Sequence, residues 1–275
     1  ISAAHLNRKG CLSVEEQAVG EQTQPSSTIL ETRNLTKDFK GFTAISDVSI
    51  NVRTGSIHAL IGPNGAGKTT FFNLLTKFLK PSAGQIIYAG KDITNARPAG
   101  IAQQGLIRSF QISAVFPHLS ARENVRVALQ RKLGISYHFW RPVRILDQLN
   151  EEAQATLEQV GLGPFADTKA VELAYGQKRA LEIATTIALK PRLMLLDEPT
   201  QGMSSEDVGT VTELIRKVVD GRTIVMVEHN LNVVSTLADT ITVLNRGEVL
   251  AEGNYDTVST NPAVMEAYMG TTDAA

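Results

Sequence analysis

Nine consecutive residues have the types and spacing needed to hold a chain of phosphates: Gly62-Pro63-Asn64-Gly65-Ala66-Gly67-Lys68-Thr69-Thr70. The glycines allow successive backbone N–H groups to turn inward and form a concave anion site. A helix that starts directly after the loop adds the positive end of its dipole. In such a loop Lys68 reaches the β- and γ-phosphates, and the Thr69 hydroxyl coordinates Mg²⁺. The sequence therefore predicts a nucleoside triphosphate site.

The flanks of this loop support the same interpretation. An apolar, strand-like run at 57–61 precedes it, and a helix-like run at 69–79 follows, with Phe72, Leu75 and Leu79 on one stripe. A chance glycine-rich turn does not require this strand–loop–helix context, whereas a phosphate loop does.

A second group of candidate residues is the acidic pair Asp197-Glu198, which follows the apolar run 193–196. Such a run is typical of a central parallel strand, and it places both acids at the strand's carboxyl end, where ligands bind. There Asp197 would hold Mg²⁺, directly or through water, and Glu198 would polarise a water for in-line attack on the γ-phosphorus. Taken alone, the pair is also compatible with a helix cap before Pro199.

The elements that must position these residues alternate between strands and helices. Residues 120–161 have helical patterns apart from a break at 134–142, and an apolar face is expected at Leu149, Ala153, Leu157 and Val160. Strands are predicted at 29–34, 44–52, 56–61 and 85–89, a second strand–helix block at 177–229, and a hairpin of 241–244 with 248–251. We predict an α/β fold in which a helical insertion separates two halves of the core.

Composition limits the classes of function. The 27 Lys and Arg nearly balance the 28 Asp and Glu, which argues against general nucleic-acid binding. No apolar segment approaches the roughly 20 residues that span a bilayer, and the start of the chain lacks an export signal. The single cysteine, Cys11, cannot form an internal disulfide. We expect a soluble protein of a reducing cytosol, with a disordered N-terminal extension at 1–27 and a short tail at 271–275.

The segment Leu173-Ala174-Tyr175-Gly176-Gln177, before a helix predicted at 178–189, gives the chain a family resemblance. It resembles the ATP-binding cassette (ABC) transporter ATPases, whose Leu-Ser-Gly-Gly-Gln motif occupies this place before the acidic strand. The resemblance covers nearly all of residues 29–270, with the motifs in the family's order. It implies an ABC ATP-binding domain at 28–270: a RecA-like α/β core of the P-loop NTPase type, an antiparallel β subdomain, and a helical subdomain inserted at about 112–171.

In that family the five-residue motif completes the site of the opposite subunit by presenting backbone N–H groups to the γ-phosphate. The resemblance therefore implies nucleotide-contacting roles for Ala174, Tyr175, Gly176 and Gln177. Ala174 replaces the usual serine, so a serine hydroxyl contact is lost, and Tyr175 replaces a glycine. Without the resemblance, a Tyr-Gly pair before a helix indicates only a turn.

Four further positions take their roles from the resemblance. Phe39, 23 positions before Gly62, matches the aromatic that stacks on adenine, with a core position as the alternative. Gln111 matches the glutamine that links Mg²⁺ and water to the transmembrane partner, and otherwise indicates an exposed loop. His229 matches the histidine at the γ-phosphate, although strand-end histidines are commonly structural. Ser204 replaces an aspartate that contacts the opposite subunit, which puts that contact in doubt.

Several short segments narrow the subfamily. Residues 173–184, 108–125 and 261–270 resemble the branched-chain amino-acid importer ATPases. This implies the ATP-hydrolysing motor of an importer, with Lys68, Glu198 and His229 in catalysis and ATP and Mg²⁺ as cofactors. It further implies permease subunits and a second cassette, identical or not, as partners at the cytoplasmic face of the membrane.

Alternative functions remain open at this point. Importers of urea or amides and lipopolysaccharide-export ATPases share parts of the pattern. Soluble ABC ATPases of DNA repair or translation usually carry two cassettes or a long coiled coil, and this chain shows neither. A non-hydrolysing structural cassette is disfavoured because Lys68, Asp197, Glu198 and His229 are all present.

Overall fold

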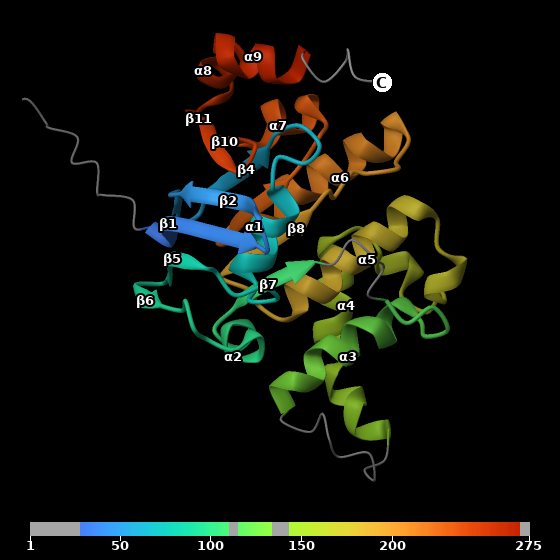
Figure 1. Cartoon of the computed structure of the whole chain (residues 1–275). Helices are drawn as coiled ribbons and strands as arrows, with labels where there is room; N and C mark the ends of the chain where they lie inside the picture. Colours follow the sequence, from blue (N-terminus) through green and yellow to red (C-terminus); the bar gives the residue numbers. More distant parts are fainter. Residues whose placement is uncertain (1–27, 110–114, 134–142, 270–275) are drawn as a thin grey trace, which may run out of the picture.

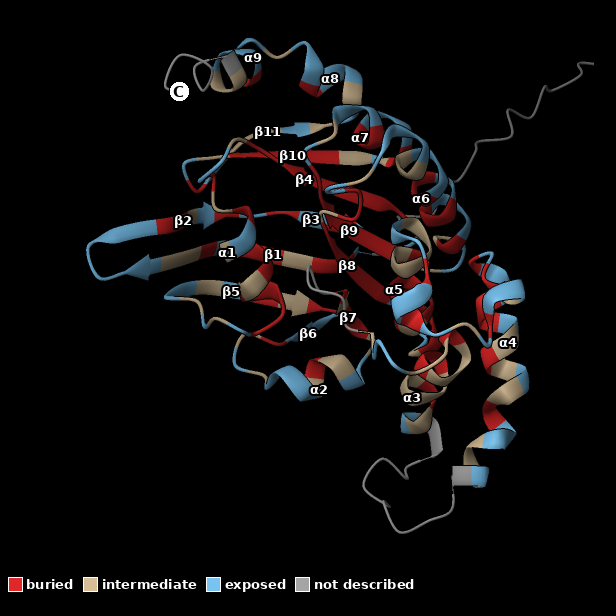
Figure 2. Cartoon of the chain, turned by 90° about the vertical axis from the view of Figure 1, so that its right-hand side faces the viewer, coloured by how far each residue is buried: buried red, intermediate tan, exposed pale blue. Residues whose placement is uncertain are grey.

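The computed structural model describes residues 28–109, 115–133 and 143–269. Its centre is a six-stranded sheet (Figure 1) in which every neighbouring pair is parallel except the antiparallel edge strand β11. The strand order is β11 (Glu248–Gly253), β10 (Thr240–Asn245), β4 (Ile57–Ile61), β9 (Thr223–Val227), β8 (Leu193–Asp197) and β7 (Leu106–Ser109). All residues of β4, β8 and β9 are buried (Figure 2), as expected of apolar runs covered on both faces.

A second, antiparallel sheet lies beside the first. It contains β1 (Thr28–Phe39), β2 (Phe42–Val48), β3 (Asn51–Arg53), β5 (Ala83–Tyr88) and β6 (Lys91–Asp92). The helix α1 (Lys68–Leu75) buries Phe71 and Phe72 in one apolar cluster shared by both sheets. That packing fixes the start of α1, and hence the loop before it, against the central sheet.

Apart from α2, whose Ile101 lies in the same apolar cluster as α1, the remaining helices cover the other face of the central sheet or extend from it (Figures 1 and 2). The helices other than α1 are α2 (Pro98–Gln103), α3 (Ala121–Leu133), η1 (Val143–Leu149), α4 (Asn150–Gln159), η2 (Gly163–Phe165), η3 (Ala170–Glu172), α5 (Tyr175–Ala188), α6 (Ser205–Val218), α7 (Leu231–Leu237), α8 (Tyr255–Ser259) and α9 (Pro262–Met269). Helices α3 and α4 pack on α5, and the expected apolar face of Leu149, Ala153, Leu157 and Val160 is buried there. The fold is the predicted α/β core with an antiparallel sheet and inserted helices.

Four predicted boundaries were wrong. The strand predicted at 29–34 extends to Phe39 as β1. The helix after the phosphate loop ends at Leu75 and not at residue 79, because Lys77 has a left-handed φ of 64° and the Thr76 hydroxyl donates to the Phe72 carbonyl. The strand predicted at 44–52 is divided into β2 and β3, with the left-handed Asp47 next to the division. The helix predicted at 178–189 begins earlier, at Tyr175.

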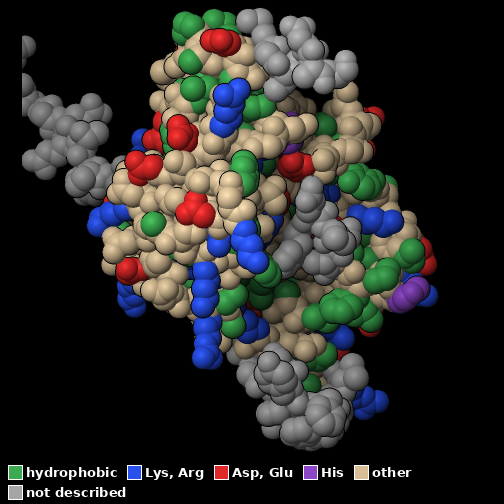
Figure 3. Space-filling view, viewed as in Figure 1, with side chains coloured by type: hydrophobic (Ala, Val, Ile, Leu, Met, Phe, Trp, Pro, Cys, Tyr) green, Lys and Arg blue, Asp and Glu red, His purple; other side chains and the backbone are tan. Residues whose placement is uncertain are grey.

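Charged side chains of both signs are interspersed on the face shown in Figure 3, as the near-neutral net charge of −1 leads one to expect. Among the described residues, no helix combines the length and apolar character needed to cross a bilayer. The predicted extension at 1–27 and the tail at 271–275 lie outside the described residues.

Candidate active site

The phosphate loop connects β4 to α1 and is shaped by two close approaches of the backbone. Gly62 has a φ of 150°, and a Cβ built on it would lie 2.1 Å from the Leu244 carbonyl oxygen of β10. Gly67 has a φ of 100°, and its Cβ would lie 2.7 Å from the Ala44 carbonyl oxygen. Both positions therefore require glycine. Ala66 is buried, whereas Asn64, Gly65 and Thr69 are exposed and Pro63, Gly67 and Thr70 are half-buried.

The Lys68 side chain points back into this loop. Its Nζ donates to the carbonyl oxygens of Gly62 at 2.6 Å and Pro63 at 2.9 Å. Burial lowers the pKa of Lys68, and the negative charge of Glu198 opposes that shift. The electrostatic contact connects the phosphate loop to the acidic pair at the end of β8.

The acidic pair Asp197-Glu198 lies at the carboxyl end of a central parallel strand, as predicted from the sequence. Asp197 ends β8 and pairs in register with Val227 of β9, and β9 pairs in turn with β4. Gly62, Asp197 and His229 therefore all lie at the carboxyl edge of three neighbouring strands. The helix-cap alternative for Asp197-Glu198 is wrong, because α6 begins only at Ser205 with Ser204 as its cap.

Glu198 and His229 form a contact pair at this edge. The His229 Nε2 lies 2.8 Å from the Glu198 Oε1, with side-chain exposures of 44% and 15%. Glu198 has a left-handed φ of 46°, and its N–H donates to the Val227 carbonyl. Its second oxygen, Oε2, is buried and has no hydrogen-bond partner among the described residues.

Two charged residues at the site were not selected from the sequence. Arg108 of β7 forms an ion pair with Asp197, and both side chains are largely buried. Glu228 is also buried, and it accepts hydrogen bonds from the Thr200 hydroxyl and from the backbone N–H of His229. Glu228 directly precedes His229 and follows the apolar strand β9. Its position at the end of that strand could have identified it as a candidate site residue from the sequence. For Arg108 no local signal exists.

The turn at 174–177 lies against a different part of the chain. Ala174 caps α5, and its N–H donates to the Gln177 Oε1 at 3.0 Å. The Tyr175 hydroxyl donates to the Gln201 carbonyl at 3.1 Å, and a Cβ on Gly176 would lie 2.8 Å from the Asp207 Oδ1. Tyr175 therefore joins this turn to residues 201–207. No hydrogen bond among the described residues joins the turn to the phosphate loop of the same chain.

Phe39 lies at the tip of the β1–β2 hairpin with 42% of its surface exposed, so the alternative of a core position is wrong. The Lys37 Nζ lies 5.1 Å from its ring centroid. Ser204 accepts from the Asp207 N–H and caps α6. Gln111 lies outside the described residues.

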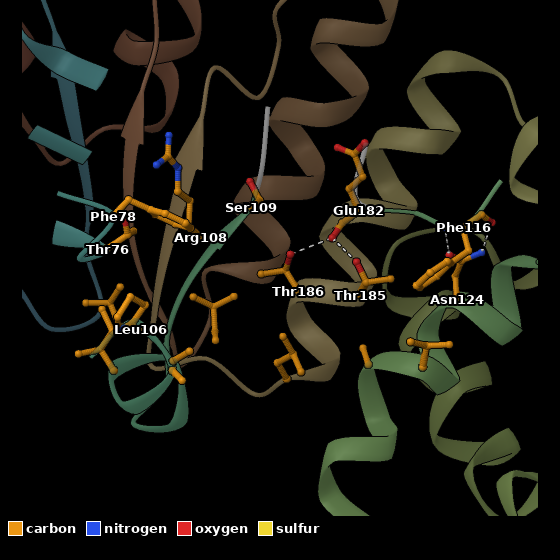
Figure 4. Close-up of a pocket in the computed structure, with 18 residues that line it drawn as sticks. Thr76, Phe78, Leu106, Arg108, Ser109, Phe116, Asn124, Glu182, Thr185 and Thr186 are labelled. Carbon is orange, nitrogen blue, oxygen red and sulfur yellow. Dashed lines mark hydrogen bonds between the residues drawn. The ribbon is translucent and has the colours of Figure 1, made fainter. Parts of the chain in front are cut away.

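An apolar groove of about 450 Å³ lies apart from the phosphate loop, between the end of α1, α2 and β7 on one side and α3 and α5 on the other (Figure 4). The exposed rings of Phe78 and Phe116 line it, together with the buried Asn124 and Glu182. Asn124 fixes the Phe116 backbone by accepting from its N–H at 2.7 Å.

Comparison with known proteins supports the family assignment. Residues 45–201 match the ABC transporter family, and residues 248–274 match the family described as branched-chain amino acid ATP-binding cassette transporter. The chain is 38% identical over 252 residues to a high-affinity branched-chain amino acid transport ATP-binding protein, BraF, of Pseudomonas aeruginosa, covering 89% of this chain and 99% of the relative. It is 34% identical over 252 residues to LivG of Escherichia coli, with the same two coverages of 89% and 99%.

Solved structures have the same fold. An ATP-binding cassette of an ABC transporter in its ADP conformation superposes with a TM-score of 0.80 at 31% identity, covering 89% of this chain and 99% of that one. A dimeric cassette bound to ADP and Pi in a post-hydrolysis state gives a TM-score of 0.68 at 26% identity, covering 82% and 98%. The chain therefore belongs to the ABC transporter family, as one of its ATP-binding cassette ATPases.

Proposed function

We propose that this chain is the ATP-hydrolysing motor subunit of an importer for branched-chain or other amino acids. The observation that carries the proposal is the convergence of Lys68, Asp197 and the Glu198–His229 pair at one edge of the central sheet. The family match of residues 248–274 and the amino-acid transport functions of BraF and LivG support the amino-acid class of substrate.

ATP would bind with its phosphates in the loop 62–67 and at the start of α1, and its adenine on the exposed ring of Phe39. Lys68 would exchange the carbonyl oxygens of Gly62 and Pro63 for the β- and γ-phosphates. The loop glycines and the helix start supply backbone N–H donors, with Thr70 in the first turn of α1.

The residues present fit Mg²⁺. This ion prefers oxygen ligands and is commonly held by one or two carboxylates together with substrate phosphates. The described residues contain no cluster of three His, Cys, Asp or Glu that would enclose a metal. The Thr69 hydroxyl and the Asp197 carboxylate would therefore share the ion with ATP, and Gln111 is a third proposed ligand. When bound, Mg²⁺ neutralises charge that develops on the phosphates.

Hydrolysis would use the Glu198–His229 pair. Because His229 occupies Oε1, Oε2 is the oxygen left to accept a hydrogen bond from the attacking water. His229 is partly exposed at the site and would contact the γ-phosphate. The turn 174–177 of a second cassette would complete the site, since a twofold head-to-tail pair generates two such sites.

The permease subunits would dock in the groove of Figure 4, which combines exposed aromatic rings with a largely apolar wall. In this arrangement the chain is a peripheral subunit on the cytoplasmic face of the membrane. The predicted helical subdomain at about 112–171 supplies one wall of the groove through α3.

The test is uptake of labelled leucine, isoleucine and valine by cells of the source organism that lack this chain. Complementation with the parent chain should restore uptake, and Lys68→Ala should not, because it removes the phosphate-binding ammonium group. Purification of the parent chain from detergent-treated membranes should recover permease subunits. Restored uptake of urea without any effect on these amino acids would contradict the substrate class, and recovery of no membrane protein would contradict the importer assignment.

A further inference from the structure

The side chain of Arg108 connects three parts of the site in a way that sequence motifs do not indicate. On β7 it pairs in register with Leu195 of β8, and Asp197 follows two residues later on the same face of that strand. Arg108 and Asp197 therefore extend from neighbouring strands toward α1. Their side chains are 11% and 4% exposed, so the ion pair is almost fully removed from water.

The guanidinium group uses separate nitrogens for separate partners. Its Nη2 donates to the Asp197 Oδ2, and its Nη1 donates at 2.6 Å to the Oδ1 of Asn73 on α1. The Arg108 Cζ also lies 5.8 Å from the centroid of the Phe72 ring. Helix α1 begins at the phosphate loop, so this one planar group ties the carboxylate of Asp197 to the helix that carries Lys68 and Thr69.

We propose that Arg108 is a positioning residue for the metal site: it occupies Oδ2 of Asp197 and holds the carboxylate in place relative to α1. The proposal rests on the proposed roles of Asp197 and Thr69 in holding Mg²⁺. A carboxylate that is already anchored through one oxygen presents the other to a metal or its water without first losing rotational freedom. A planar guanidinium can bridge two acceptors on different elements, whereas a lysine ammonium is a point charge on a flexible stem.

The consequence is measurable as divalent-cation binding, separate from hydrolysis. Mn²⁺ is added to the full-length chain with a saturating non-hydrolysable ATP analogue, and free Mn²⁺ is followed by electron paramagnetic resonance. Arg108→Met keeps an apolar stem on Phe72 but removes both hydrogen-bond donors. Its half-saturation should therefore require at least about 10-fold more Mn²⁺ than that of the parent chain, the usual effect of losing a group that orients a metal ligand. The Mn²⁺ concentration for half-saturation of Arg108→Lys should fall between those of the parent chain and of Arg108→Met.

The matched control is Arg126→Met on α3. Arg126 is also 11% exposed and ion-paired, through Nη1 to the Asp147 Oδ1 at 3.3 Å, but it belongs to the inserted helices. The substitution Arg126→Met should lower the melting temperature without changing the Mn²⁺ concentration needed for half-saturation. If Arg108→Met does not fold, Asn73→Ala tests the same connection by removing only the acceptor on α1, with a severalfold increase expected.

The outcomes separate the two proposals. If the variants at Arg108 and Asn73 bind Mn²⁺ within twofold of the parent, while their melting temperatures fall, Arg108 is only structural and the inference is wrong. If the parent binds the analogue but no Mn²⁺ at all, the metal site of the proposed function is wrong, and the inference falls with it.

Discussion

The substitution Gly62→Ala tests whether the backbone of β10 shapes the phosphate loop. The new Cβ would lie 2.1 Å from the Leu244 carbonyl oxygen and 3.2 Å from the Ala66 Cβ, at a φ of 150°. An unfavourable backbone conformation costs about 1–3 kcal/mol, and forcing an extra methyl into a packed site costs about 1–3 kcal/mol more. The Leu244 carbonyl belongs to a paired strand and cannot rotate away, so the total should be roughly 2–6 kcal/mol.

Gly65→Ala is the matched control within the same loop. Gly65 also has a positive φ, 79°, but nothing lies within 4 Å of its Cβ position, so only the left-handed cost of about 1–2 kcal/mol applies. For a chain of this size each kcal/mol lowers the melting temperature by about 2–4 °C. Thermal unfolding followed by circular dichroism should show the larger decrease for Gly62→Ala. Equal melting temperatures for the two variants would refute the argument.

Three other changes have defined outcomes. Burial lowers the pKa of His58 to about 4, so it stays neutral in the fold while the unfolded chain gains a proton near pH 6.5. Stability should therefore fall by roughly 3 kcal/mol as pH decreases from 6.5 to 4, and His58→Gln should flatten that part of a urea-unfolding profile. The buried Lys77 ammonium has no hydrogen-bond partner among the described residues and a pKa lowered to about 8. Lys77→Met should raise the melting temperature at pH 7, with the gain shrinking above pH 8 as the parent's lysine loses its proton; an unchanged melting temperature at pH 7 would contradict this. Tyr175→Phe removes the hydrogen bond that joins the 174–177 turn to Gln201, so we expect a lower kcat for ATP hydrolysis; an unchanged kcat would show that this hydrogen bond does not hold the turn in its catalytic position.

Much of the site could be predicted because its residues are coded locally. The phosphate loop occupies nine consecutive positions, and Asp197, Glu198 and His229 lie within two residues of the end of an apolar run that is typical of a central strand. The parallel sheet then brings the strand ends together, since neighbouring parallel strands end at the same edge.

The parts that were missed depend on distant contacts. Arg108 reaches Asp197 only because β7 and β8 are neighbours in the sheet, and a single arginine in a short strand gives no sign of this. The early end of α1 depends on a left-handed Lys77, a conformation usually signalled by glycine. The partner of Tyr175 became apparent only from the packing of α5 against residues 201–207.

The most direct test of the central claim is ATP hydrolysis by the purified Glu198→Gln variant, measured as phosphate release with a second cassette present. Glutamine keeps the size of the side chain but cannot accept a proton from the attacking water. The variant should bind ATP like the parent, release no phosphate above background and accumulate as a closed dimer. Phosphate release at the parental rate would contradict the role of the Glu198–His229 pair in catalysis.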